Sequence, residues 1–255
     1  MHTSSICIVC TASAETGQAL ALSKAAGLTL LDTKNSDYDL QLCFENDAVK
    51  LYDTALDTAI EVDFTAGALA HRHQYGGGRG QALARAVGLK HGRMPSVLDV
   101  TAGLARDAYV LASLGCKLTL VEQSPVLYAL VKDGIRRGLA DPNSAAVLRN
   151  FMNLVNADAV LYMEHMDRET RPDVIYIDPM YPDRKKTALV KKDMQILHRL
   201  LAKNNNDVKL LETALECAGN RVVVKRPLHA RPVGDLKPDT TISSKKTRYD
   251  VYLCH

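Results

Sequence analysis

The sequence predicts an α/β fold, in which a mostly parallel sheet carries helices on both faces and follows a small N-terminal α+β region. Two observations predict this fold. From residue 96 onward, short apolar strand-like runs alternate with amphipathic helix-like segments, which is typical of a parallel sheet. Several of these runs end at an acidic residue, and ligands of such sheets bind beyond the carboxyl ends of the strands. We therefore expect a binding site at that edge.

Residues 1–70 are predicted to form the α+β subdomain. Alternating apolar residues indicate strands, and a helix-like pattern stops at Gly27. The expected strands lie at 6–10, 28–31, 38–44, 48–52 and 60–64, and the expected helix lies at 15–26. The third and fourth of these strands flank a polar turn, so we expect them to form a hairpin.

Residues 71–95 are predicted to be a Gly-rich connector followed by a short helix. Three consecutive glycines, and a fourth at Gly80, expose backbone N–H groups that can hold an anion. Positive charge is added by three arginines: Arg72, Arg79 and Arg85. A flexible connector is the alternative interpretation. His71 and His73 have no matching Cys or Asp cluster in the sequence, so we expect no metal site there.

Residues 96–255 are predicted to form the main domain. Its expected strands lie at 97–100, 117–121, 151–156, 174–177, 221–224 and 248–253. Its expected helices lie at 106–114, 125–138, 189–201 and 208–218. The pattern favours helices that each turn one apolar face toward the sheet.

The turn between the first strand and helix of this domain is built from small residues. Thr101, Ala102 and Gly103 follow Asp99, which lies inside the strand. Such a turn presents backbone N–H groups to a ligand, and the Asp99 carboxylate can hold a cationic group or orient the turn. The G-x-G-x-x-G fingerprint of dinucleotide sites is absent, which argues against a nicotinamide enzyme. A plain buried turn, capped by Asp99, is an equal alternative at this point.

Further acidic residues follow the later strands. Glu122 ends the second strand and can accept hydrogen bonds from two ribose hydroxyls, or it is simply a solvated acid. Asp158 can accept from an adenine amine, or it caps the helix that begins at Ala159. Arg106 and Asp107 start the first helix, where Asp107 either meets a ligand or complements the helix dipole.

The segment Asp178-Pro179-Met180-Tyr181-Pro182 is the sharpest motif of the chain. Two prolines enforce a non-helical turn at a strand end. The Asp178 carboxylate and the Pro179 carbonyl then become rigid acceptors for the two N–H bonds of an exocyclic amine, and Tyr181 can stack on the base. This arrangement positions a poor nucleophile for in-line attack on a methyl group. A rigid turn that only caps the sheet is the alternative.

These motifs resemble class I S-adenosylmethionine-dependent methyltransferases that methylate amines, and in particular the ribosomal RNA small-subunit methyltransferase J family. The resemblance covers most of residues 60–255. The stretches that carry it start at His71 (HRHQYGGGRGQ), Asp99 (DVTAGLARD), Asp178 (DPMYP), Ala188 (ALVKK) and Arg221 (RVVVKRP). It implies a Rossmann-like, mostly parallel seven-stranded sheet. Ala105 departs from the family, which usually has Gly at that position.

The resemblance implies N2-methylation of a guanine near the 3′ end of bacterial 16S ribosomal RNA, with S-adenosyl-L-methionine as cofactor. Asp178, Pro179 and Tyr181 are the expected catalytic residues. The expected cofactor-binding residues are Asp99, Gly103, Arg106, Asp107, Glu122, Gln123, Asp158, Ala159 and Asp178. The remaining alternatives are a methyltransferase for adenine N6 in DNA or RNA, and a non-catalytic RNA-binding protein with the same fold.

Basic residues fit ribosomal RNA, or the small ribosomal subunit, as the partner. They would position phosphates rather than read bases, and a target base would have to leave its stack. The expected RNA-binding residues are Arg79, Arg184, Lys185, Lys186, Lys225 and Arg226. Solvated surface lysines are the alternative interpretation for each of these side chains.

Composition fits a globular protein of this kind. The 255 residues are 47% apolar and 24% charged, and the net charge of +3 does not by itself identify a nucleic-acid partner. No run approaches the roughly 20 apolar residues of a membrane span, and no secretory signal is visible. We therefore expect a cytoplasmic protein. The six cysteines include one C-x-x-C pair without a second pair, which favours reduced thiols over a zinc site.

Overall fold

The computed structural model describes residues 5–11, 15–65, 78–90, 92–179, 192–201 and 207–254. The chain divides into two compact units, and neither is continuous in sequence. The first unit contains residues 1–62, 124–137 and 180–204, and the second contains 63–123, 138–179 and 205–255.

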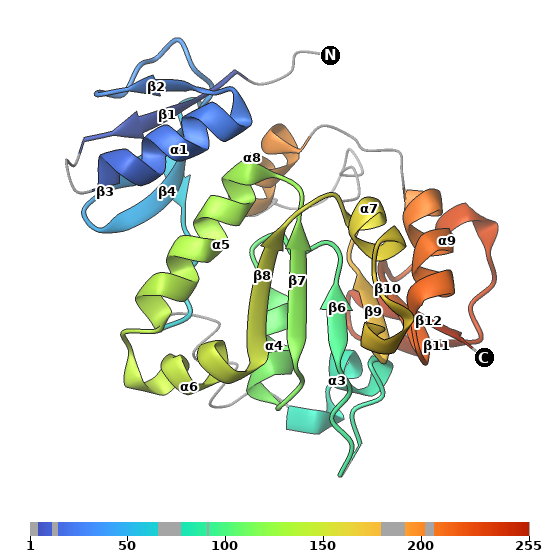
Figure 1. Cartoon of the computed structure of the whole chain (residues 1–255). Helices are drawn as coiled ribbons and strands as arrows, with labels where there is room; N and C mark the ends of the chain where they lie inside the picture. The colour runs from blue at the N-terminus through green and yellow to red at the C-terminus, as the bar shows by residue number, and fades with distance from the viewer. Residues whose placement is uncertain are drawn as a thin grey trace. The chain divides into compact units, whose positions relative to one another are not determined.

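The first unit contains a five-stranded sheet in the order β2-β1-β3-β4-β5 (Figure 1). Its strands are β1 (Ile6–Cys10), β2 (Thr29–Leu31), β3 (Leu40–Glu45), β4 (Ala48–Asp53) and β5 (Thr58–Ile60). Its helices are α1 (Thr16–Ala26), most of α5 (Pro125–Gly138), and α8 (Lys192–Leu200).

The expected hairpin is confirmed between β3 and β4, which pair antiparallel. Its two turn residues, Asn46 and Asp47, have φ values of 52° and 59°. Asn and Asp tolerate this left-handed conformation, and a turn with two such residues matches the twist of the strands. In contrast, β1 runs parallel to both of its neighbours, so its backbone is paired on both edges.

The second unit is built on a seven-stranded sheet in the order β11-β12-β10-β9-β6-β7-β8. Its strands are β6 (Val97–Asp99), β7 (Leu118–Glu122), β8 (Met152–Asn156), β9 (Val174–Ile177), β10 (Arg221–Pro227), β11 (Thr240–Ser243) and β12 (Thr247–Leu253). Its α-helices are α3 (Ala82–Ala86), α4 (Arg106–Ser113), α6 (Pro142–Phe151), α7 (Ala159–Glu164) and α9 (Asp207–Cys217). Its described residues also form the short 3-10 turns η2 (Gly78–Gly80), η3 (Arg168–Thr170) and η4 (Val233–Asp235).

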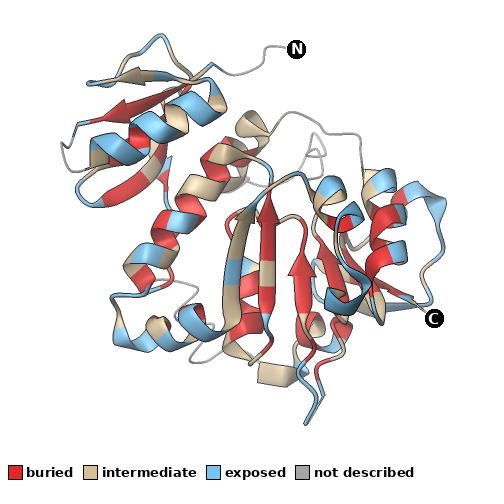
Figure 2. Cartoon of the chain, viewed as in Figure 1, coloured by how far each residue is buried: buried red, intermediate tan, exposed pale blue. Residues whose placement is uncertain are grey.

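The predicted mostly parallel sheet is confirmed. The five strands from β8 to β10 run parallel, whereas β12 and β11 pair antiparallel at one edge. Helices cover both faces, with α4 behind the sheet and α7 and α9 in front of it (Figure 1). Parallel strands covered on both faces are apolar along their length, which explains the fully buried run of β9 (Figure 2).

The core under α7 and α9 follows from the alternation of side chains along the strands. Leu98, Ile175 and Val222 turn toward these helices and pack against Leu211 and Met163. Burying a side chain of this size contributes about 1.5 to 3 kcal/mol. This core holds the strand ends, and therefore the site described below, in a fixed arrangement.

The structure differs from the expected elements in a few places. A helix, α6, and an edge strand, β11, occur where the sequence analysis expected neither. The last strand of the N-terminal sheet lies at Thr58–Ile60 rather than at 60–64. In the part of the chain that the structure describes, no helix is long and apolar enough to cross a membrane.

Candidate active site

The carboxyl ends of four neighbouring strands carry the functional side chains of the second unit. Asp99 ends β6 and Glu122 ends β7, while Asp178 directly follows β9. Lys225 lies on β10, one residue beyond the pair Val224 and Ile177. Because these strands are parallel neighbours, their ends meet at one edge of the sheet, as the sequence predicted for the three acids.

The turn after β6 is fixed by hydrogen bonds from its own residues. Asp99 is buried, and its Oδ1 accepts from the Thr101 N–H at 3.0 Å and from the Thr101 hydroxyl at 3.3 Å. Desolvation by burial raises the pKa of Asp99 to about 7, with nearby Asp178 and Asp107 raising it further and the Thr101 hydrogen bonds opposing them. The carboxylate therefore orients the turn, which is one of the two roles expected for it.

Glu122 holds the next part of the same turn. Its Oε2 accepts from the Gly103 N–H at 2.9 Å, and its side chain is buried, so it is not a solvated strand-end acid. Gly103 has a φ of 54°, and among the described residues a Cβ added there would meet only the Thr101 carbonyl oxygen, at 3.7 Å. None of these residues closes the space above Gly103 to a ligand, while Glu122 holds the backbone below it.

The start of α4 adds a third carboxylate, that of Asp107. Ala105 precedes the helix in the left-handed conformation, with a φ of 55°, and Arg106 beyond it is exposed. Asp107 lies in the first turn of α4 and is half-buried. Its Oδ2 accepts from Lys225 Nζ at 2.7 Å and from the Tyr176 hydroxyl at 2.8 Å. Asp107 therefore links the helix to β9 and β10 in addition to complementing the helix dipole.

Asp178 is tied to this turn through its backbone and its side chain. Its N–H donates to the Thr101 hydroxyl at 2.7 Å, and its Oδ2 accepts from Lys225 Nζ at 2.8 Å. Desolvation raises the pKa of Asp178 to about 6, against the opposing effect of the Lys225 ammonium. The Asp178 side chain is 37% exposed, so a ligand can still reach it.

Pro179 follows Asp178 and is buried. Residues 180–191, which include Tyr181 and the predicted RNA-binding residues Arg184, Lys185 and Lys186, lie outside the described residues, as do the histidines and consecutive glycines of 71–77. The proposed stacking of Tyr181 on a base therefore stays a prediction.

Asp158 has the geometry of a helix cap. Its Oδ1 accepts from the Leu161 N–H at 3.0 Å at the start of α7, which confirms the capping alternative for this side chain. Its carboxylate is exposed, and contact with an adenine amine stays a prediction. Gln123 is exposed, and Ala159 packs against the core under α7 and α9.

The remaining predicted RNA-binding residues do not form one exposed patch. Arg226 is buried and donates to the Arg231 carbonyl oxygen, so a phosphate could reach it only if this part of the fold opened. Burial raises the pKa of the Cys116 thiol to about 11, and Arg79 lies close enough to oppose this rise. Cys116 precedes β7, so Arg79 lies near the amino ends of the strands, away from Asp178.

Lys225 is the residue whose role the sequence analysis missed. From the sequence, Lys225 was expected to contact RNA phosphates, whereas in the structure its ammonium lies between two carboxylates. Tyr176 was missed entirely. The available signal was positional, because both residues lie on strands at the edge where the acids converge.

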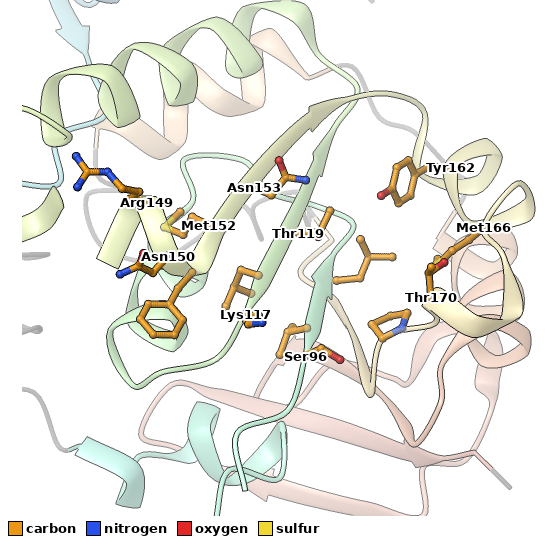
Figure 3. Close-up of a pocket in the computed structure, with 15 residues that line it drawn as sticks. Ser96, Lys117, Thr119, Arg149, Asn150, Met152, Asn153, Tyr162, Met166 and Thr170 are labelled. Carbon is orange, nitrogen blue, oxygen red and sulfur yellow. The ribbon is translucent and has the colours of Figure 1, made fainter. Parts of the chain in front are cut away.

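A groove of about 370 Å³ lies elsewhere in the second unit (Figure 3). It is lined by the first residues of β6, β7 and β8, including Val97, Leu118 and Met152. These residues are at the amino ends of the strands, so the groove is distinct from the carboxylate site. Among the described residues, no group of three His, Cys, Asp or Glu side chains could hold a metal ion.

Comparisons with known proteins agree with this geometry. Residues 22–254 match the family model "Putative SAM-dependent methyltransferase". The chain is 53% identical to ribosomal RNA small subunit methyltransferase J of Colwellia psychrerythraea over 195 residues, which cover 76% of this chain and 70% of the relative. It is 50% identical to the protein of the same name from Nitrosococcus oceani over 207 residues, or 81% of each chain.

A solved structure is also similar. The SAM-dependent methyltransferase from Neisseria gonorrhoeae superposes on this chain with a TM-score of 0.77 and is 35% identical in sequence. The superposition covers 97% of this chain and 96% of the other.

Proposed function

The chain belongs to the S-adenosylmethionine-dependent methyltransferase family, and we propose that it methylates N2 of a guanine near the 3′ end of small-subunit ribosomal RNA. The relatives named above are ribosomal RNA small subunit methyltransferases, which supports this substrate. When bound, S-adenosylmethionine supplies an electrophilic methyl group on a sulfonium centre.

The residues of the carboxylate site fit this cofactor. The carboxyl groups of Asp99, Asp107 and Asp178 lie close enough to repel one another, and Lys225 binds two of them. A cationic ligand, such as the amino-acid and sulfonium end of the cofactor, is attracted to this group of acids. The open space above Gly103 gives a ligand close access to the backbone.

The substrate amine is held by Asp178 and Pro179. The lone pair of an exocyclic amine is delocalised into the base, so the amine is a weak nucleophile. Two acceptors, the Asp178 carboxylate and the Pro179 carbonyl, bind its two N–H bonds and direct the lone pair toward the cofactor end of the site. This is catalysis by positioning and electrostatic stabilisation, and it requires no strong general base.

One observation carries the proposal. The Asp178 N–H donates to the Thr101 hydroxyl at 2.7 Å, and Thr101 belongs to the turn that Asp99 and Glu122 hold. The acceptor for the amine and the open turn are therefore parts of one hydrogen-bonded unit. A base that reaches Asp178 must be extruded from its stack, as other base-modifying enzymes require.

The test is methyl transfer to ribosomal RNA by Asp178→Ala. We expect a loss of roughly 10²-fold or more in kcat, because an acceptor for the amine is removed. The substrates are small ribosomal subunits and naked 16S RNA from cells lacking the protein, with labelled cofactor. Asp167→Ala, a change of an exposed acid outside the site, is the matched control and should keep full activity.

Mass-spectrometric identification of the methylated nucleoside separates the alternatives. N2-methylguanosine supports the proposal, whereas N6-methyladenosine supports the adenine alternative. Binding of RNA without any methyl transfer by the wild-type protein would support a non-catalytic role. Unchanged transfer by Asp178→Ala would remove Asp178 from the mechanism.

A further inference from the structure

The Lys225 side chain links Asp107, at the start of α4, to Asp178, at the end of β9. Its Nζ lies 2.7 Å from Asp107 Oδ2 and 2.8 Å from Asp178 Oδ2, and 23% of the side chain is exposed. The register explains this position, because Val224 of β10 pairs with Ile177 of β9, which places the next residues of both strands side by side. A lysine here reaches a carboxylate on the neighbouring strand without leaving the sheet.

Titratable groups from the neighbouring elements lie near this ammonium or near the carboxylates that bind it. Asp107 on α4, Asp178 after β9 and Tyr249 on β12 interact with Lys225 itself, whereas Asp99 on β6 and Tyr176 on β9 interact with Asp107 and Asp178. Tyr249 pairs with Lys225 across the antiparallel ladder, and burial raises the pKa of Tyr249 to about 12. Tyr176 is fully buried and its hydroxyl donates to Asp107, so both tyrosines stay neutral near pH 7.

Lys225 stays charged in this setting. Burial alone lowers the pKa of Lys225, but the Asp178 and Asp107 carboxylates together raise it well above its usual range. A permanently protonated lysine cannot serve as a general base. Two of its three N–H donors bind carboxylates, so most of the charge that would attract an RNA phosphate is already balanced within the site.

We propose that Lys225 is a positioning residue, whose ammonium holds the Asp178 carboxylate through Oδ2 and leaves Oδ1 to accept the amine of the target base. The same ammonium fixes Asp178 relative to Asp107, so the amine acceptor and the start of α4 are kept in register. This inference rests on the proposed function, because the base amine is the group that Asp178 would bind.

The assignment makes a specific prediction for pH dependence. Lys225 lowers the pKa of Asp178, whereas burial and Asp107 raise it. Removal of the ammonium should therefore raise the pKa of Asp178, so a higher pH is needed to ionise it. In the plot of kcat against pH, the acidic limb, over which kcat rises as Asp178 ionises, should move to higher pH by about one unit or more.

The experiment compares Lys225→Met, Lys225→Arg and Lys209→Met. Lys225→Met keeps most of the stem and removes the charge, so we expect kcat to fall at least tenfold near pH 7, with KM for ribosomal RNA changed less than threefold. Lys225→Arg keeps the charge and should return the limb close to its wild-type position. Lys209 on α9 forms an exposed ion pair with Glu164, so its variant is the matched control and should leave the profile unchanged.

Asp107→Asn is a second variant, and it should shift the pKa of Asp178 in the opposite direction. Asp107 raises the pKa of Asp178, so its neutralisation should shift the limb to lower pH when cofactor is saturating. Carbon-13 NMR titration of the aspartate carboxyl groups in the cofactor-free proteins gives a readout that does not depend on activity. It should show the Asp178 titration moving up in Lys225→Met and down in Asp107→Asn.

The outcomes distinguish the two proposals. If Lys225→Met raises KM for RNA but leaves both the pH profile of kcat and the Asp178 titration unchanged, Lys225 is a phosphate contact and the inference is overturned. Loss of stability alone, with the same titration, would reduce it to a structural ion pair. Absence of methyl transfer by the wild-type protein would overturn the proposed function, while the NMR titration would still test Lys225.

Discussion

The buried carboxylate of Asp99 makes the stability of the fold depend on pH. In the folded state its pKa is raised to about 7, whereas an unfolded aspartate titrates near 4. A raised folded pKa means that the protonated form is favoured by folding. The stabilisation is therefore fully present below about pH 4 and is lost as the pH rises through 7.

Asp99→Asn removes this dependence and keeps an oxygen that can accept from Thr101. Relative to wild type, the variant should gain roughly 2 to 3 kcal/mol of unfolding free energy between pH 5 and pH 8. The measurement is urea denaturation of both cofactor-free proteins at the two pH values. An equal difference at both pH values would mean that Asp99 is already ionised at pH 5.

Ala105 makes a second prediction for a single residue. It adopts a φ of 55° before α4, and this left-handed conformation costs an alanine about 1 to 2 kcal/mol. Ala108 is equally buried but lies within α4, whereas Ala105 precedes that helix. Both changes to glycine remove one buried methyl, but only Ala105→Gly relieves strain.

We therefore expect Ala105→Gly to destabilise the protein by about 2 to 3 kcal/mol less than Ala108→Gly does, because the strain relieved at Ala105 adds to the roughly 1 kcal/mol that glycine costs inside a helix. Chemical denaturation of the two variants measures the difference. A difference of only about 1 kcal/mol would show that Ala105 carries no backbone strain.

At the residue level, the sequence predicted the acids of the site but not their partners. Asp99, Glu122 and Asp178 could be placed because each ends or follows an apolar strand, and parallel strands end at one edge. The contacts of Lys225 could not be placed, because they depend on β10 pairing with β9, and no local pattern encodes which strands are neighbours.

At the level of elements, apolar patterns predicted the buried strands well and the edge elements poorly. Helix α6 was missed although Asp141 caps it and Pro142 occupies its first turn, which are both helix-start signals. Strand β11 reads Thr-Thr-Ile-Ser and is mostly exposed, so its stability comes from pairing with β12 rather than from its own sequence. Strand propensity depends on such context.

The same reasoning explains why the central strands of the seven-stranded sheet were predicted correctly from the sequence. Strands β6, β7 and β9 are largely buried on both faces, so apolar residues dominate them up to the acids that end β6 and β7, and this pattern distinguishes them from loops. Strand β8 lies at the edge beside β7 and carries Asn153 and Asn156, which explains its weaker signal in the sequence.

For the whole molecule, the sequence suggests a division in chain order, whereas the structure groups distant segments. The first unit combines residues 1–62 with 124–137 and 180–204. Periodicity along the chain cannot reveal such a grouping, because the interactions that create it join residues far apart in sequence. The three-part division at residues 70 and 95 stays a prediction.

Asp133 on α5 is central to this long-range grouping within the first unit. The side chain is buried, and its Oδ2 accepts from the Val49 N–H of β4 at 3.0 Å, across 84 positions of sequence. Arg136 and Arg137 donate to the same carboxylate. Arg137 also donates to the Val62 carbonyl at 2.6 Å, so one acid organises contacts between α5 and two parts of the N-terminal segment.

Asp133→Ala should therefore weaken the attachment of α5 to the N-terminal sheet. We expect a loss of about 2 to 3 kcal/mol, because a buried N–H loses its acceptor while the partly exposed arginines recover some hydration. Denaturation by urea measures the loss, and hydrogen exchange at the Val49 amide should accelerate with it. Asp32→Ala, a change of an exposed acid in the same unit, is the control and should stay within about 0.5 kcal/mol of wild type. Equal stability of the two variants, with the Val49 amide still protected, would mean that the unit is held by its apolar contacts and that the Asp133 network contributes nothing to it.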